Sequence, residues 1–90
     1  MPPREFEYAD QLRREGFWHI YVWQDGPNAH YPDHIHPTLS AHIILEGEMT
    51  LTMNGEARTF RAGERCDVPA GTFHAAQIGR KGCRYRIGEK

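Results

Sequence analysis

The chain of 90 residues has no long hydrophobic run. Its longest uninterrupted aliphatic segment is Ile43–Leu45, whereas a membrane-spanning helix needs about 20 mostly apolar residues. The opening residues, Met1–Glu7, also lack the apolar core of a signal peptide. We therefore expect a soluble, cytoplasmic protein with no membrane partner.

An excess of charge of one sign is missing as well. The chain has 11 Lys and Arg residues against 12 Asp and Glu residues, with a formal net charge of -1. Proteins that hold nucleic acid or acidic membranes depend on an excess of positive charge. We expect no nucleic-acid partner, and small neutral or anionic molecules are the expected ligands.

Cysteine is scarce. Cys66 and Cys83 are the only two, too few to cross-link a secreted scaffold, and we expect both to be reduced, buried thiols rather than catalytic ones. A chain of this length buries about two-thirds of the surface that its unfolded form exposes. It can build one modest core, so we expect a single domain over residues 1–90.

Helix-forming residues are confined to the N-terminal part. Residues 8–15 favour a short helix that ends at Gly16, a residue suited to a helix C-terminus. From Phe17 to Gln24 aromatic and β-branched residues dominate, which favours a half-buried strand. Further along, Pro32 and Pro37 exclude a regular helix around them.

The remainder has the pattern of short strands separated by glycine and proline turns. Met49–Met53 alternates apolar with polar residues. The Asn54-Gly55 dipeptide after it favours a type I′ hairpin turn, with a return strand over residues 57–60. Further strands are expected at 41–45, 65–68, 75–78 and 83–87. Many short strands with one short helix predict an all-β sandwich or barrel.

The aromatic strand also predicts self-association. A small barrel has exposed edge strands, which are ready to pair or pack across a two-fold axis. Phe17–Trp23 is the candidate edge, and we expect a homodimer.

Six histidines are many for this chain, and His30, His34 and His36 fall close together. In a strand, side chains two residues apart face the same side, so His34 and His36 would lie about 7 Å apart at their Cα atoms. Neutral imidazole is the commonest metal ligand and suits Zn, Cu, Fe and Ni. A lone His-x-His pair is equally typical of two exposed histidines, so this pattern alone leaves both interpretations open.

A second pattern follows in the other half of the chain. Gly63, Pro69, Gly71 and His74 are spaced as glycine, five residues, proline, one residue, glycine, two residues and histidine. Physically, this spacing describes a turn, a strand, a rigid Pro-x-Gly corner and one histidine positioned by that corner.

With these two patterns the chain resembles the cupin family. The matching positions are His34, His36 and Gly47 in the family's first motif, and Gly63, Pro69, Gly71 and His74 in its second. The resemblance implies a double-stranded β-helix, or jelly-roll barrel, over about residues 17–88, preceded by an N-terminal segment 1–16. It also implies that His34, His36 and His74 point into the barrel and bind one divalent transition-metal ion (Fe, Zn, Ni, Mn or Cu).

The chain departs from the family pattern at three positions. Asn28 stands where the first motif begins with glycine, Ile78 where the second ends with asparagine, and Ser40 where the family has its acidic metal ligand. A serine hydroxyl is neutral and a poor ligand, so we expect Ser40 to line the pocket without completing the usual shell. His42 faces the same side of the strand; it is either a fourth nitrogen ligand or a pocket-lining histidine that binds substrate or water.

Other candidate residues have simpler interpretations. We expect His19 and His30 to be surface or structurally satisfied histidines. Asp33 is expected to support a neighbouring histidine or to be a surface carboxylate. Phe73 is expected to line the pocket beside His74.

A three-histidine centre predicts chemistry on a small molecule, because open coordination positions accept substrate or oxygen. Without a carboxylate ligand, the ion would be more positive and a stronger Lewis acid. The first hypothesis is a metal-dependent cupin that acts on a small molecule as an oxygenase-type or isomerase-type enzyme. The alternative is a non-catalytic cupin that senses or stores a small ligand. A third hypothesis is a degenerate, metal-free barrel.

Overall fold

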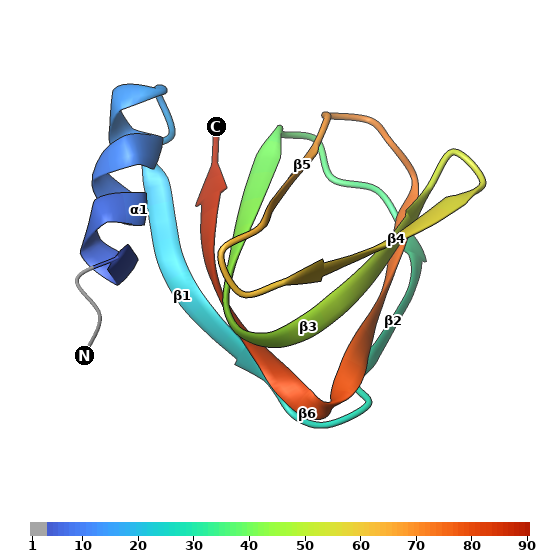
Figure 1. Cartoon of the computed structure of the whole chain (residues 1–90). Coiled ribbons are helices and arrows are strands. Elements are labelled where there is room, and N and C mark those ends of the chain that lie inside the picture. The colour runs from blue at the N-terminus through green and yellow to red at the C-terminus, as the bar shows by residue number, and fades with distance from the viewer. Residues whose placement is uncertain (1–3) are drawn as a thin grey trace.

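The computed structural model describes residues 4–90 and contains one helix followed by six strands (Figure 1). The helix and strands are α1 (Arg4–Arg14), β1 (His19–Asp25), β2 (His30–His34), β3 (Ser40–Met53), β4 (Glu56–Arg61), β5 (Arg65–Val68) and β6 (His74–Glu89). All strand pairs are antiparallel, so the expected all-β class is confirmed. No helix within residues 4–90 is long and apolar enough to cross a membrane.

The two longest strands, β3 and β6, pair with each other along most of their length. The first part of β3 pairs with β5 and the second part with β4. Similarly, the end of β6 pairs with β1 and its beginning with β2. Each half of the β3–β6 pair is therefore the centre of a four-stranded arrangement, and Figure 1 shows the sheet folding back on itself where both strands bend. This is the jelly-roll barrel that the sequence predicts.

The bend depends on a close approach of Gly47 in β3 to Gly82 in β6. Both residues have positive φ, 78° and 81°, a conformation that residues with a Cβ rarely adopt. A Cβ atom built on Gly47 would lie 2.1 Å from the carbonyl oxygen of Gly82. Only glycine at position 47 lets the two backbones cross at this distance.

Because of this bend, four predicted strands are in fact two. The segments 41–45 and 49–53 both belong to β3, and the segments 75–78 and 83–87 both belong to β6. From the sequence, the glycines between these segments predict turns. In the structure they bend a strand whose ladder continues on both sides of shifts in register.

Other boundaries also differ from the sequence prediction. The helix begins at Arg4 rather than at residue 8, and it ends at Arg14. Gly16 follows with a φ of 96°, and Phe17 N donates a hydrogen bond of 3.0 Å to Leu12 O. Both features are expected for a glycine cap. Strand β1 begins at His19 rather than at Phe17, because Phe17 is buried in the cluster beneath the helix. The sequence does not predict strand β2, because Pro32 cannot donate a hydrogen bond to a strand ladder. In the structure β2 pairs with β6 at the edge of the sheet, and an edge strand tolerates proline.

The hairpin turn has the predicted form. Asn54 and Gly55 both have positive φ, 53° and 78°, as a type I′ turn requires. Met53 and Glu56 close the hairpin as register partners.

Hydrophobic residues are buried on both faces of β3. Ala41 and Ile43 pack with Leu12 and Phe17 beneath helix α1, which lies outside the barrel (Figure 1). Ile44 belongs to the larger cluster on the other side. Burial on both faces explains why this part of β3 is a continuous apolar run rather than an alternating one.

The Gly47 contact yields the first prediction. Both Gly47→Ala and Gly55→Ala force a Cβ into positive φ, which costs about 1–2 kcal/mol, but no atom lies within 4 Å of a Cβ on Gly55. Because the Gly82 carbonyl blocks a Cβ at position 47, we expect Gly47→Ala to lower the free energy of unfolding by at least about 2 kcal/mol more than Gly55→Ala does. Urea denaturation measures both values; equal losses would show that the contact does not constrain the fold.

Candidate metal centre

Three histidine rings meet inside the barrel. The ring centroids lie 4.1 Å apart for His34 and His74, 4.9 Å apart for His34 and His36, and 5.2 Å apart for His36 and His74. One nitrogen from each ring lies within 4.8 Å of the other two. The three histidines predicted from the sequence therefore form a cluster that could bind a metal ion.

Two segments that are distant in the sequence bring this cluster together. His34 is the last residue of β2 and pairs directly with His74, the first residue of β6. The chain leaves the strand after His34, so His36 is not on a regular strand, although its ring still approaches the other two. The Pro-x-Gly corner holds it there, because the Gly71 N donates a hydrogen bond of 2.9 Å to the carbonyl of His36.

Backbone hydrogen bonds select the nitrogen that the His34 and His74 rings offer. His34 Nδ1 lies 2.8 Å from the carbonyl of Pro32, and His74 Nδ1 lies 3.0 Å from the carbonyl of Thr72. A carbonyl only accepts, so both Nδ1 atoms carry the proton and donate it. The lone pair is then on Nε2 of both rings, the arrangement that metal-binding histidines commonly have.

The spacing of the nitrogens fits one ion. Two imidazole nitrogens bound to the same zinc ion at about 2.1 Å lie at most about 4.2 Å apart. The observed separations of up to 4.8 Å exceed this limit only slightly, so small side-chain rotations suffice. His74 is buried, with 3% of its surface exposed; burial, and to a smaller degree His34 and His36, lower its pKa, which favours the neutral ring that a metal requires.

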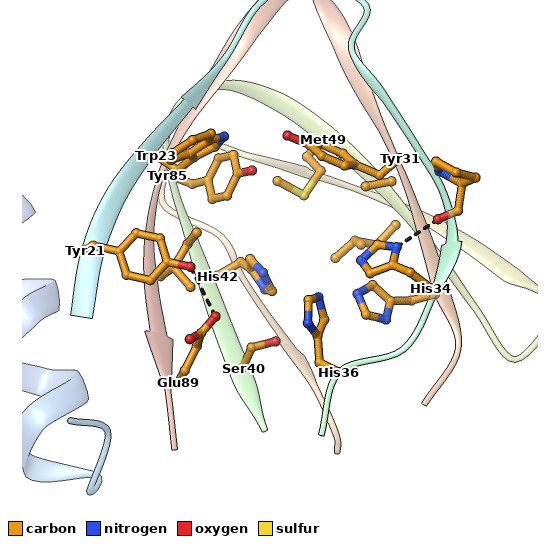
Figure 2. Close-up of a pocket in the computed structure, with 15 residues that line it drawn as sticks. Tyr21, Trp23, Tyr31, His34, His36, Ser40, His42, Met49, Tyr85 and Glu89 are labelled. Atoms are coloured by element: carbon orange, nitrogen blue, oxygen red, sulfur yellow. Dashed lines mark hydrogen bonds between the residues drawn. The ribbon is translucent and has the colours of Figure 1, made fainter. Parts of the chain in front are cut away.

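The cluster opens into a cavity of about 530 Å³, a size typical of small-molecule sites. Ser40 and His42 both line it (Figure 2), because they alternate with the outward-facing Ala41 and Ile43. Ser40 Oγ and His42 Nδ1 are buried and have no hydrogen-bond partner among the described residues. Ser40 is therefore part of the cavity wall.

His42 lies in the same cavity but not in the group of three converging histidines. Its role as a fourth ligand stays a prediction. Burial lowers the pKa of His42 to about 4, and the nearby backbone of Cys66 only partly opposes this shift. His42 is therefore a neutral ring at neutral pH.

Four aromatic residues that the sequence analysis did not count as pocket residues also line the cavity. They are Tyr21, Trp23, Tyr31 and Tyr85. Strand alternation was the available signal, because Tyr21, Trp23 and Asp25 occupy one face of β1.

The structure contradicts the expectation that Phe73 lines the pocket. Its side chain is 64% exposed and is not among the residues that line the cavity. Neighbouring residues in extended chain face opposite sides, so the orientation that sends His74 inward turns Phe73 outward.

The other titratable candidates lie elsewhere. His19 is exposed and contacts Trp18 and Tyr21 edge to face, whereas exposed His30 pairs with Gln77 Oε1 at 3.0 Å. Asp33 is exposed on β2.

Both cysteines are free and buried, as expected. Burial raises the pKa of the Cys66 thiol to about 11 and that of Cys83 to about 12. Neither thiol has the lowered pKa that a catalytic nucleophile needs.

Comparisons with known proteins agree with this geometry. The family profile described as "Cupin domain" matches residues 21–84. No curated protein matches the chain significantly.

Similar solved structures include an enzyme. The DMSP lyase DddQ of Ruegeria pomeroyi is 26% identical with a TM-score of 0.72, over 79% of this chain and 36% of the lyase. The cupin domain of Schizosaccharomyces pombe Cnp3 is 19% identical with a TM-score of 0.71, over 84% of this chain and 58% of that one. A cupin superfamily protein of Desulfitobacterium hafniense is 18% identical with a TM-score of 0.68, over 78% and 64%. The chain spans less than two thirds of the length of each.

The lowered pKa of His42 predicts an acid-sensitive fold. The unfolded chain takes up a proton on His42 below its ordinary pKa of 6.5, whereas the folded protein does so only near pH 4. The contribution of His42 to stability is therefore complete above pH 6.5 and is lost as the pH falls towards 4, by up to about 3 kcal/mol at 1.36 kcal/mol per pKa unit.

His42→Gln removes this titration and keeps a polar side chain. In urea denaturation of metal-free protein between pH 7 and 4.5, we expect the stability of the wild type to fall more steeply than that of His42→Gln. His74 titrates in both proteins, so its contribution cancels. Parallel pH profiles would show that His42 is not protected from protonation.

Proposed function

The chain belongs to the cupin family, and from this premise we propose that it is a metal-dependent cupin that acts on a small molecule in its central cavity. The observation that carries the proposal is the convergence of His34, His36 and His74 on one wall of the cavity. Imidazole ligands suit Zn, Fe, Ni or Cu, to which the family resemblance adds Mn, rather than the oxygen-binding ions Mg²⁺ and Ca²⁺.

The ion and the residues around it would have different roles at such a site. A bound divalent ion would supply a Lewis acid with free coordination positions. Ser40 Oγ and His42 Nδ1, which have no hydrogen-bond partner within residues 4–90, would hydrogen-bond the polar group of the substrate and orient it. Burial of unpaired polar atoms is unfavourable, and a substrate that satisfies both atoms would remove that cost.

The proposed reaction is an oxygenase-type or isomerase-type step. The similarity to a lyase adds elimination as a third type of reaction. At 26% identity the DMSP lyase supports enzyme chemistry in a barrel of this shape. Its match covers only 36% of the lyase, so its substrate is not transferred to this chain. Oxygen uptake with a panel of small thiols, diketones and phenols tests the oxygenase form.

A non-catalytic ligand-binding cupin is the second candidate. The observation that favours it is Ser40, which stands where the family has an acidic ligand and whose hydroxyl makes no hydrogen bond to any residue that the structure describes. A protein that binds metal and small molecules but turns over none of the panel would support this candidate over the enzyme.

Removal of cluster histidines tests the metal site. We expect protein purified without an affinity tag to hold about one transition-metal ion per chain, and His34→Ala and His74→Ala to hold less than about a tenth of that. His30→Ala is the matched control, because His30 is exposed and outside the cavity, and it should keep the metal. Elemental analysis measures the metal content of the wild type and of each variant. Wild-type protein that stays metal-free after incubation with Zn²⁺ and Fe²⁺ would rule out the proposal.

Ser40→Glu tests the interpretation of the missing carboxylate. The new side chain would project from the cavity wall where the resemblance places the acidic ligand. A carboxylate adds both a ligand atom and a negative charge, so we expect Zn²⁺ affinity to rise at least about tenfold. Ser40→Gln controls for size and should leave affinity near that of the wild type. If both variants bind Zn²⁺ equally, position 40 does not face the metal centre.

A further inference from the structure

The aromatic residues that line the cavity have their polar atoms hydrogen-bonded to carboxylates. Tyr85 Oη donates to Asp25 Oδ2 at 2.6 Å, Tyr31 Oη also donates to Asp25, and Trp23 Nε1 donates to Asp25 Oδ1 at 3.0 Å. On the neighbouring wall, Tyr21 Oη donates to Glu89 Oε2 at 3.1 Å, as the dashed line in Figure 2 shows. The polar atom of each of the four aromatic side chains thus has a carboxylate partner.

The charge around these rings is negative. Asp25 is buried, with 7% of its surface exposed, and its carboxylate accepts hydrogen bonds from three side chains. Glu89 lines the cavity itself, and no Lys or Arg does so among residues 4–90. Two carboxylates therefore lie beside the four aromatic residues of this part of the cavity.

The hydroxyls stay protonated in this arrangement. Burial and the Glu89 carboxylate raise the pKa of Tyr21 to about 12. Burial and Asp25 also raise the pKa of Tyr85. The phenols remain neutral donors, and donation to a carboxylate adds electron density to rings whose faces already attract cations.

We propose that Tyr21, Trp23, Tyr31 and Tyr85 form a subsite for a methylated cation, such as a quaternary ammonium group, beside the histidine cluster. A methylated cation has no N–H groups that need acceptors, which fits a wall whose acceptors already have donors. Ring faces and two carboxylates attract its positive charge, while Met49 and Leu51, which also line the cavity, contact its methyl groups.

The subsite deepens the proposed function by naming a ligand class for the same cavity, but it does not itself require a metal. The competing occupant is a neutral apolar group of the same shape. Figure 2 places Trp23 and Tyr85 on the side of the cavity opposite His34, whereas Tyr31 lies near His34. The two parts are tested separately because ligand binding and metal content are measured independently.

An isosteric pair of probes distinguishes a cation site from an apolar one. Choline and 3,3-dimethylbutan-1-ol have the same shape and differ by the positive charge. We expect wild-type protein to bind choline at least about tenfold more tightly in an NMR titration, both after chelation and after loading with Zn²⁺. Equal binding, or preference for the alcohol, would overturn the subsite and leave the metal site untouched, because metal content is measured independently.

Matched variants locate the binding. Trp23→Leu should weaken choline binding about three- to thirty-fold and leave binding of the alcohol nearly unchanged. Trp18→Leu is the control, since Trp18 is 77% exposed and outside the cavity. Glu89→Gln keeps the size of its side chain and should weaken choline binding alone; it also serves if Trp23→Leu fails to fold. Loss of choline binding in Trp18→Leu but not in Trp23→Leu would contradict the assignment.

Discussion

The crossing of the Gly47 and Gly82 backbones is the constraint on which the rest of the structure depends. It lets β3 and β6 bend while their ladder continues on both sides of the bend. The bend folds one sheet into two facing halves. Ser40 and His42 then come from one half, and His34 and His74 from the other, so that residues far apart in the sequence line one cavity. The candidate site is a direct consequence of a backbone contact that contains no side chain.

The hairpin could be predicted from local spacing alone, whereas the histidine cluster could be predicted because its two local patterns together resemble those of the cupin family. His-x-His, the Pro69-x-Gly71 corner with His74, and Asn54-Gly55 each specify the geometry of a few neighbouring residues. The structure adds how two such segments meet, through the His34–His74 register and the bond from Gly71 to the carbonyl of His36. Local spacing could not show that a carbonyl fixes Nδ1 of both His34 and His74.

What the sequence did not reveal depends on contacts across the barrel. A glycine at a bend inside a strand and a glycine in a turn look alike in a sequence, so β3 and β6 were each divided in two. The inward orientation of Trp23 and Tyr85 follows from which face of β1 and β6 is covered, and that is decided by the other half of the sheet. The prediction that Phe73 lines the pocket is wrong because the orientation of this side chain follows from that of His74 rather than from its hydrophobicity.

The cavity joins a nitrogen-rich wall to an aromatic wall that is backed by carboxylates, with Ser40 and His42 as unpaired polar groups in the same space. Such a combination adds little to stability and is typical of a binding site. The central claim is that the nitrogen-rich wall binds one metal ion. A crystal structure of Zn²⁺-loaded protein, with anomalous data at the zinc edge, tests it most directly. The account predicts one ion held by His34, His36 and His74 at about 2.0–2.1 Å. A zinc ion bound elsewhere, with these three rings uncoordinated, would contradict it.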